Sequence, residues 1–297
     1  MDLLAKMATF VRVVEAGSLS AAARQLRLSP AAVSRQVTGI EDELGVSLLA
    51  RTTRKLAVTP MGRRYYERCL RILRDVDDAQ AVGRGGAVDG PLQVTAPVTF
   101  GLARVAPHMQ SLMRKHPQLR LDLRLEDRLI DLALEGVDVA IRVGMPLPVS
   151  TELIAQSLSS FQRVLVAAPR YVKRAGEPRT PEALAKHATL GYSGASGGWW
   201  LTDGEREVRI QHTPQFRCNA LHAIRELAVG GVGLALLPDW LVRAELDRGE
   251  LKRVLPSWAG ETVSVNAIYR LEHRGAPRVK ALIEHLRAEY AADGRRM

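Results

Sequence analysis

The sequence has little cysteine and no long apolar segment, and both shortages limit what the chain can be. Cys69 and Cys218 are the only cysteines among its 297 residues. Two thiols so far apart in sequence suit a reducing compartment, and we expect both to be buried. A redox-sensing pair would need a resolving cysteine close to the first. Because no run of about 18 uninterrupted apolar residues is present, we expect no membrane-spanning helix.

The N-terminus also lacks the pattern of an export signal. The segment MDLLAKMATFVRVVEAGS carries Asp2, Lys6, Arg12 and Glu15, whereas a signal peptide has a basic start followed by an apolar run. We therefore expect a cytoplasmic protein.

Motifs for catalysis, metals and cofactors are scarce. The seven histidines form no HExxH pair, two cysteines are too few for a metal cluster, and GVG is no complete dinucleotide fingerprint. Gly194, Ser196 and Gly198 spell GxSxG, but Asp203 and Gly204 indicate a hairpin turn where a hydrolase elbow needs a helix. We expect no metal, no cofactor and no enzyme. The alternative, a serine hydrolase, predicts an activity that Ser196→Ala abolishes.

Basic residues outnumber acidic ones, and they concentrate in one stretch. With 42 Lys and Arg against 32 Asp and Glu, the net charge of +10 favours a polyanionic partner. Between positions 51 and 74 the single acid is Glu67, and the bases are Arg51, Arg54, Lys55, Arg63, Arg64, Arg68, Arg71 and Arg74. A solvated helix face would explain an isolated run of this kind, so its meaning depends on what precedes it.

A helix-turn-helix pattern precedes this basic stretch. One apolar stripe predicts a first helix that ends near Gly17 and contains Leu3, Leu4, Met7, Phe10, Val11 and Val14. Ser18 can cap a second helix at about 20–26, whose alanines allow close helix packing. After a short turn, Ser29 is suited to cap a third helix, with Pro30 at its first position.

The third helix has the two faces expected of a recognition helix. Its apolar face, spaced by four, three and four residues, comprises Val33, Val37, Ile40 and Leu44. The other face is small and basic near its start, with Ala31, Ser34, Arg35 and Thr38. Acidic residues 41–43 crowd its end, so the N-terminal end is the part suited to DNA. Simple three-helix packing would also explain the apolar face, but not the basic stretch that follows.

A short hairpin is expected next. Strand-like runs at 46–49 and 56–58 flank the segment RTTRK. Such a basic wing is suited to phosphate or minor-groove contacts, which position a protein on DNA.

These residues together carry a family resemblance. The run FVRVVEAGSLSAAARQLRLSPAAVSRQVTGIEDELGVSLLARTTRKLAVTPMG resembles the N-terminal domain of LysR-type transcriptional regulators throughout. The resemblance implies DNA contacts from Ser29, Pro30, Ala31, Ser34, Arg35, Arg51, Thr53, Arg54 and Lys55. Arg35 is the main candidate for a base or phosphate contact.

A fourth helix should follow from Thr59 and Pro60 to about 82, before a glycine-rich stretch at 83–90. Its apolar seam has nearly coiled-coil spacing and comprises Tyr65, Cys69, Ile72, Val76 and Ala79. The seam either pairs with a second chain or packs on the protein's own body. The resemblance implies a dimerising linker, so that two DNA-binding heads would contact paired half-sites.

From position 91 onward strands and helices alternate, which predicts an α/β domain around a mainly parallel sheet. The clearest strand patterns are 92–96, 119–125, 137–143 and 164–168. The helical patterns are 102–115, 128–135, 181–187, 219–230 and 277–290.

The family resemblance continues here through the segments APVTFGLARVAPHM, HPQLRLDLRLEDRLIDLALEGVDVAIRVG, GEPRTPEALAKH and GGVGLALLPDWLV. They are similar to the effector domain of the same regulators, which has the two-lobed fold of type 2 periplasmic binding proteins. The expected fold is therefore α/β with an all-α N-terminal part. The expected divisions are a winged helix-turn-helix at 1–59, a linker helix and hinge at 60–90, and an effector domain at 91–297. Within the last, lobe I would comprise 91–161 and 268–297, and lobe II 162–267.

Ligands of such folds bind between the lobes. Pro97, Thr99 and Phe100 stand between a strand and a helix, where the Thr99 hydroxyl and backbone N–H groups either hold an anion or simply cap the helix. Arg142 ends the apolar run VDVAIR and either grips a carboxylate or pairs with a neighbour. Asn219 is either a pocket wall or a cap. The resemblance matches Thr99, Arg142 and Asn219 to cleft-lining positions.

Trp199 and Trp200 either form the floor of a site for an aromatic effector or belong to the core. Trp199 lies in a region where the resemblance gives no guidance. The predicted effector is a small molecule, either a carboxylate or an aromatic compound.

The resulting hypothesis is a bacterial DNA-binding regulator whose effector cleft controls how its paired heads sit on a promoter. The resemblance implies homodimers that assemble into homotetramers, and contact with RNA polymerase. A solute-binding protein is the competing interpretation, since it would share the C-terminal fold, but it would leave the N-terminal domain without a role.

Overall fold

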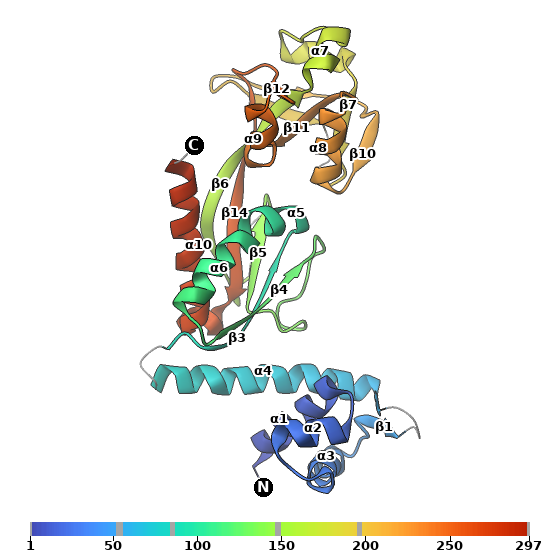
Figure 1. The fold of residues 1–297 in the computed structure, drawn as a ribbon, viewed down its shortest axis with the longest axis vertical. Coiled ribbons are helices and arrows are strands. Elements are labelled where there is room, and N and C mark those ends of the chain that lie inside the picture. Colours follow the sequence, from blue (N-terminus) through green and yellow to red (C-terminus); the bar gives the residue numbers. More distant parts are fainter. Residues whose placement is uncertain (1, 52–55, 84–86, 146–149, 195–197, 296–297) are drawn as a thin grey trace.

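The computed structural model of the chain describes residues 2–51, 56–83, 87–145, 150–194 and 198–295. Figure 1 shows a small helical domain at the N-terminus, one long helix beside it, and an elongated α/β domain. The fold class predicted from the sequence is thus confirmed. None of the helices in the described ranges has the length and apolar character needed to cross a membrane.

The N-terminal domain consists of α1 (Leu3–Ala16), α2 (Leu19–Leu26), α3 (Pro30–Leu44), β1 (Leu49–Arg51) and β2 (Leu56–Val58). Both predicted serine caps are present. The Ser18 hydroxyl accepts a hydrogen bond from the N–H of Ala21 at 3.1 Å. The Ser29 hydroxyl accepts one from the N–H of Ala32, also at 3.1 Å. Between α2 and α3, Arg27 turns the chain with a left-handed φ of 55°.

The predicted apolar faces meet in one core. Phe10 of α1 is fully buried there, together with Val33, Val37 and Ile40 of α3. Leu44 was expected on the same face, but it is 44% exposed. That expectation is wrong because α3 ends at this residue and Gly45 turns the chain away with a φ of 69°.

The hairpin begins later than the pattern at 46–49 predicts. Val46 is exposed, and β1 starts only at Leu49. The reason is Glu41 of α3, whose Oε1 accepts hydrogen bonds from the N–H groups of Leu48 at 2.7 Å and Leu49 at 3.0 Å. The strand predicted at 56–58 is confirmed as β2.

The linker helix α4 (Pro60–Gly83) starts where the sequence predicts. The Thr59 hydroxyl accepts a hydrogen bond from the N–H of Gly62 at 2.9 Å and donates to the carbonyl of Ser47 at 2.8 Å. A Cβ atom at Gly62 would lie 2.0 Å from the carbonyl oxygen of Leu48. Glycine therefore allows α4 to pass close to the hairpin.

The apolar seam of α4 is divided between two environments. Its first half packs on the chain's own N-terminal domain, with Cys69 buried and the rings of Tyr65 and Phe10 centred 5.5 Å apart. Further along, Ile72 and Ala79 are exposed. Packing on the protein's own body thus accounts for the beginning of the seam, and its end stays available to a partner.

The α/β domain is built on one nine-stranded sheet and a small three-stranded sheet. The strands of the main sheet are β3 (Gly90–Ala96), β4 (Leu119–Leu125), β5 (Val139–Val143), β6 (Leu153–Ala167), β7 (Thr189–Tyr192), β10 (Phe216–Cys218), β11 (Leu234–Pro238), β12 (Lys252–Arg253) and β14 (Thr262–Arg270). Their order is β10-β7-β11-β6-β14-β5-β3-β4, with β12 also paired to β6. The small sheet joins β13 (Ala259–Gly260), β8 (Trp199–Thr202) and β9 (Glu207–Ile210).

Two long strands connect the lobes, and they correct the expectation of a mainly parallel sheet. Within each lobe β3 runs parallel to β4 and β5, and β7 runs parallel to β10 and β11. Every pairing of β6 and β14 is antiparallel, because these strands cross between the lobes in opposite directions. Gln162 is the last residue of β6 paired to β14, and Arg163 is the first paired to β11. The strand thus changes its partner between residues 162 and 163, and the lobe boundary near 161 stays a prediction.

The helices cover both lobes. They are α5 (Val98–Phe100), a π-helical turn (Gly101–Val105), α6 (Ala106–Lys115), α7 (Pro169–Ala175), a 3-10 turn (Pro181–Lys186), α8 (Leu221–Val229), α9 (Asp239–Asp247), a second 3-10 turn (Leu271–Gly275) and α10 (Pro277–Arg295). In Figure 1, α6 and α10 lie along lobe I, whereas α8 and α9 lie in lobe II.

Two local expectations are wrong. No helix forms at 128–135, where Asp131 Oδ1 instead accepts hydrogen bonds from the N–H groups of Ala133 and Leu134. An aspartate that bonds nearby backbone in this way stabilises a turn at the expense of a helix. Cys218, expected to be buried, is only partly so.

Candidate DNA-contact surface and effector pocket

The first turn of α3 lies open at the edge of the N-terminal domain. Ser29, Pro30, Ala31 and Arg35 are exposed, and Ser34 is half-buried. Within the described part of the chain, Arg35 has no ion-pair partner. An exposed guanidinium near a helix N-terminus is suited to phosphate or base edges.

Polar contacts that the sequence pattern does not reveal hold α3 in place. The Thr9 hydroxyl of α1 donates a hydrogen bond to Gln36 Oε1 at 2.5 Å, and both residues are buried. Lys6 and Glu43 form an ion pair between the same two helices. Together with the apolar core, these contacts hold α3 against α1. The only sequence signal was that Gln36 lies beside Val37 on the apolar face.

The wing is described only in part. Arg51 is the last residue of β1, and its backbone is described. Thr53, Arg54 and Lys55 lie outside the described residues. Their contact with DNA stays a prediction.

A cavity of about 510 Å³ lies between the two lobes. All six residues predicted to contact an effector line it: Pro97, Thr99, Phe100, Arg142, Trp199 and Asn219. Residues separated by more than a hundred positions are therefore brought to one site. Its walls also include residues that sequence reasoning missed, among them Phe161, Arg163, Tyr192, His212 and Trp240.

Arg142 extends from β5 into this cavity and is only 6% exposed. Its Nη1 donates to the carbonyl of Ile141 at 3.0 Å, whereas its buried Nη2 has no hydrogen-bond partner among the described residues. Burial lowers the pKa of Arg142, and the nearby carboxylates of Glu126 and Asp127 raise it. The alternative of a salt bridge to a neighbour finds no support, since no such pair is formed within the described ranges.

The helix start at 97–100 already has a carboxylate of its own. Pro97 occupies the N-cap position of α5, so Thr99 is not the cap. The N–H of Val98 donates to Asp127 Oδ1 at 3.1 Å. Because that carboxylate repels a second anion, the helix start is a poorer anion site than the sequence suggests. Thr99 and Phe100 remain as wall residues.

For Asn219 and for the two tryptophans, the sequence left two alternatives open. Asn219 does not cap α8, because that helix begins at Leu221 with Ala220 at the N-cap. Asn219 is therefore a wall residue. Trp199 belongs to the core of lobe II, is 8% exposed, and also lines the cavity, so that its contact with an effector stays a prediction. Trp200 is 43% exposed.

Aromatic rings from both lobes meet at the cavity. Trp240 of α9 packs edge-on against Phe100 of α5, with ring centroids 5.7 Å apart. Its contact with Phe161 of β6 has the same geometry and distance. These three rings bridge the two lobes, so a change in lobe angle has to rearrange them.

Comparison with known proteins identifies the chain. Residues 4–63 match the model described as bacterial regulatory helix-turn-helix protein, lysR family. Residues 85–291 match the model of the LysR substrate binding domain. The chain belongs to the LysR family of transcriptional regulators.

Individual relatives of this LysR-family regulator span nearly its whole length. An HTH-type transcriptional regulator of Xanthomonas campestris pv. campestris (strain 8004) is 35% identical, over 96% of this chain and 85% of that protein. The HTH-type transcriptional regulator PtxR of Pseudomonas aeruginosa is 33% identical, over 94% of this chain and 90% of its own. The solved structure of CrgA, a LysR-type regulator from Neisseria meningitidis, is 31% identical and covers 96% of this chain and 98% of its own, with a TM-score of 0.62.

The predicted function is thereby confirmed: this LysR-family protein is a transcriptional regulator with a DNA-binding and an effector-binding domain. Its relatives are named as regulators and not as enzymes. Ser196 of the GxSxG motif lies outside the described residues.

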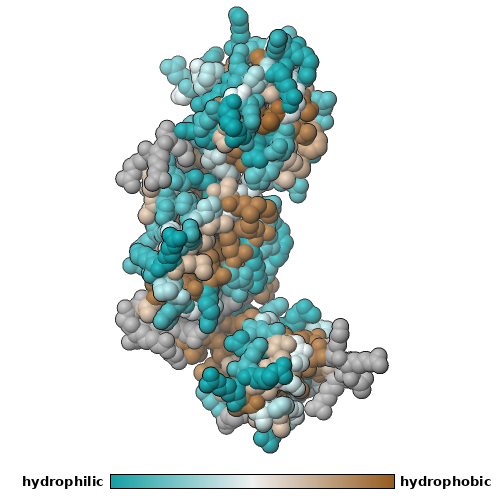
Figure 2. Space-filling view, viewed as in Figure 1, coloured by the Kyte–Doolittle hydropathy of each residue, from teal (hydrophilic) through white to brown (hydrophobic). Residues whose placement is uncertain are grey.

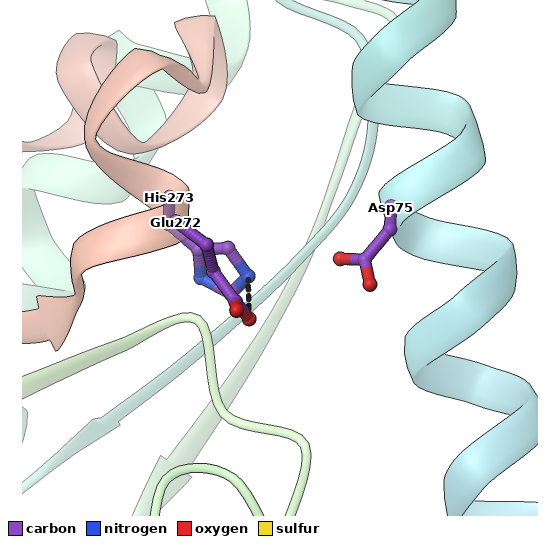
Figure 3. A group of neighbouring side chains, drawn as sticks. All are labelled: Asp75, Glu272 and His273. Carbon is purple, nitrogen blue, oxygen red and sulfur yellow. Dashed lines mark ion pairs between the residues drawn. The ribbon is translucent and has the colours of Figure 1, made fainter. Parts of the chain in front are cut away.

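Apart from the DNA-contact surface and the cavity, a cluster of polar side chains lies where the linker helix faces lobe I of the regulator. Asp75 of α4 points toward Glu272 and His273, and their ligand-type atoms lie within 4.8 Å of one another (Figure 3). Such a trio can in principle bind a metal ion. However, Glu272 already pairs with Arg270 at 2.5 Å, and His273 Nδ1 lies 3.9 Å from the buried carboxylate of Asp138. We therefore describe the cluster only as a polar contact region between the linker helix and the effector domain.

Proposed function

We propose that this regulator binds its operator through the first turn of α3 and the wing. The residues that would contact DNA are Ser29, Pro30, Ala31, Ser34, Arg35, Arg51, Thr53, Arg54 and Lys55. The supporting observation is that Arg35 is exposed, has no ion-pair partner among the described residues, and lies one turn from the start of α3. The basic residues of the hairpin and of the start of α4 would add sequence-independent attraction to phosphates.

The same proposal assigns effector binding to the cavity between the lobes, with Pro97, Thr99, Phe100, Arg142, Trp199 and Asn219 as contacts. The cavity brings all six together and contains an incompletely bonded guanidinium. A ligand can shift the lobes only by binding one arrangement more tightly than another. The aromatic contact between Phe100 and Trp240 is suited to report such a shift, because it spans both lobes.

We further propose that the protein is a cytoplasmic homodimer or homotetramer without catalytic activity that contacts RNA polymerase. The exposed end of the α4 seam favours self-association. Figure 2 shows apolar residues gathered on the surface of lobe I around α5 and α6, where Leu102 and Met113 are 54% and 46% exposed. Apolar surface of this kind commonly marks a protein interface.

A titration of duplex DNA with matched arginine variants tests the proposal. The duplex is the segment upstream of the regulator's own gene, and binding is followed by gel retardation and fluorescence anisotropy. Arg35→Ala is compared with Arg12→Ala, because Arg12 is also exposed but pairs with Glu15 at 2.9 Å.

We expect Arg35→Ala to weaken binding by about 1–3 kcal/mol if its guanidinium contacts a guanine. If it contacts a phosphate instead, the salt dependence of log K should fall by about one unit. Arg12→Ala should behave like the unmodified protein. Absence of a retarded band at low salt, or equal affinities for both variants, would refute the DNA-binding assignment.

A further inference from the structure

The cavity between the lobes concentrates aromatic side chains. Three of the four tryptophans of the chain line it, namely Trp199, Trp200 and Trp240. Phe100, Phe161 and Tyr192 line it as well. Aromatic walls of this density favour a planar, polarisable ligand, since each ring pair gains energy beyond the apolar area that it buries.

One buried cation of the cavity lining forms no ion pair with the described residues, although the carboxylates of Glu126 and Asp127 lie near enough to raise its pKa. Arg142 is 6% exposed, and its Nη2 has no partner among the described residues. A buried guanidinium with an unused donor is costly, and an anion that accepts this hydrogen bond would remove the cost. A carboxylate matches the guanidinium fork.

Both carboxylates near Arg142 already have partners within the protein. Glu126 pairs with Arg128 Nε at 2.6 Å, and Asp127 accepts the N–H of Val98. Burial lowers the pKa of Arg163, and the carboxylate of Glu261 acts in the opposite direction. An anionic ligand therefore gains the most binding free energy from a contact with Arg142.

Two rings of the opposite wall, Trp199 and His212, carry no charge, although Arg217 lies nearby. Trp199 packs against His212 with ring centroids 4.2 Å apart. His212 Nδ1 is hydrogen-bonded to the Thr189 hydroxyl at 2.7 Å. Burial, and then the charge of Arg217, lowers the pKa of His212, so the imidazole is neutral near pH 7. This wall belongs to lobe II, whereas Arg142 belongs to lobe I.

We propose that the effector is a small aromatic carboxylate, with its carboxylate bound by Arg142 and its ring against Trp199 and Trp200. This inference rests on the proposed function, which makes the cavity the effector site. Such a ligand touches lobe I through its charge and lobe II through its ring. Its binding therefore favours one separation of the lobes.

Isothermal titration calorimetry on the full chain tests both parts of the ligand. The probes are benzoate and phenylacetate, with cyclohexanecarboxylate as the saturated acid and benzamide as the uncharged ring. We expect benzamide to bind about 10- to 100-fold more weakly than benzoate, because it forfeits a charged hydrogen bond. We expect cyclohexanecarboxylate to bind about 2- to 10-fold more weakly, because it lacks a π-system.

Matched variants locate the ligand. Arg142→Gln should weaken benzoate binding about 10- to 100-fold, whereas Arg114→Gln, at an exposed residue outside the cavity lining, should leave it unchanged. Trp199→Leu should weaken binding, and Trp258→Leu should not. Trp199 and Trp258 are each 8% exposed in the same core cluster, but only Trp199 lines the cavity. Thermal unfolding of each variant, and the comparison of probes on the unmodified protein, separate lost contacts from lost folding.

Each contrary outcome has a distinct meaning. Equal affinities for benzoate and cyclohexanecarboxylate would refute recognition of an aromatic ring. Equal affinities for benzoate and benzamide would refute recognition of a carboxylate. Failure of both aromatic acids to bind below about 10 mM, a free energy weaker than roughly 3 kcal/mol by affinity arithmetic, would overturn the inference. Only a probe that binds regardless of Arg142→Gln and Trp199→Leu would also refute the cavity as the effector site. DNA retardation is measured separately and is unaffected by these results.

Discussion

Arg35 and Arg142 are both proposed to hold an anion, yet the protein places them in opposite environments. Arg35 lies exposed on a helix that is capped and held by residues from the first fifty positions. Arg142 is almost fully buried in a cavity whose walls come from positions 97 to 261.

Because one arginine is exposed and the other buried, the two sites should respond differently to salt and to substitutions. Charges at the surface are screened over about 10 Å at 0.1 M salt, whereas a buried charge is screened far less. The DNA-contact surface should therefore be sensitive to ions and tolerant of small shape changes. The cavity should be insensitive to ions and sensitive to the loss of single atoms.

The largest expected effect is that of salt. Raising KCl from 50 to 200 mM should lower DNA affinity by about 10³- to 10⁵-fold for a protein with 6 to 10 phosphate contacts. The affinity for benzoate should change only a few-fold. Anisotropy for DNA and calorimetry for benzoate, on one preparation, measure how log K changes with log [KCl] at each site. Equal slopes for the two ligands would remove the distinction between the sites.

Next in size is the loss of the N-terminal core through Phe10→Ala. Phe10 is fully buried, so the change should destabilise this domain by about 3–5 kcal/mol. The effector domain should be unaffected because it has its own cores. As a control, Leu3→Ala on the same helix removes a side chain that is 48% exposed and should cost under about 0.5 kcal/mol.

Urea unfolding followed by two signals separates the domains. Tryptophan fluorescence follows the effector domain alone, because that domain contains Trp199, Trp200, Trp240 and Trp258. Circular dichroism follows both domains. A shift of the fluorescence midpoint in Phe10→Ala would mean that the domains unfold as one unit.

A smaller effect is expected at the junction of wing and linker helix. Gly62→Ala places a Cβ atom 2.0 Å from the backbone carbonyl of Leu48. Relief of this overlap should cost about 1–3 kcal/mol and move the wing relative to α3. We expect weaker DNA binding with unchanged benzoate binding. Gly275→Ala, with no atom within 4 Å of its new Cβ, is the control.

The smallest expected effect is a difference in the rates at which the two thiols, Cys69 and Cys218, react. Burial raises the pKa of Cys69 to about 11, so at pH 8 only about one part in a thousand is thiolate. Cys218 is partly exposed. A disulfide reagent at pH 8 should modify one thiol per chain rapidly, and Cys218→Ser should remove that phase. Fast reaction of Cys69 would show that the packing of α4 on α1 opens readily.

The N-terminal domain was predictable in most of its details. Helix periodicity and serine caps predicted α1 to α3, because these signals depend on neighbours a few residues apart. The errors, at Leu44 and at 46–49, arose where Glu41 reaches across from α3 to bond the backbone before β1. No local pattern contains that contact.

For the effector domain, local patterns predicted the strands but not their arrangement. The pattern at 128–135 resembled a helix, yet the side chain of Asp131 bonds the backbone of a turn. The mixed sheet follows from two crossing strands whose partners lie about a hundred positions apart. The resemblance, and not periodicity, pointed to Thr99, Arg142 and Asn219.

By itself the sequence determined the family, the helix-turn-helix, and which residue types stand at each candidate site. These depend on local spacing and on contiguous motifs. Only the tertiary structure decided that Arg142 is buried with an unused donor, that Asp127 occupies the helix start beside Thr99, and that three tryptophans line one cavity. The physical reason is that hydrogen-bond satisfaction and burial are properties of the whole packed fold, to which distant segments contribute equally with near ones.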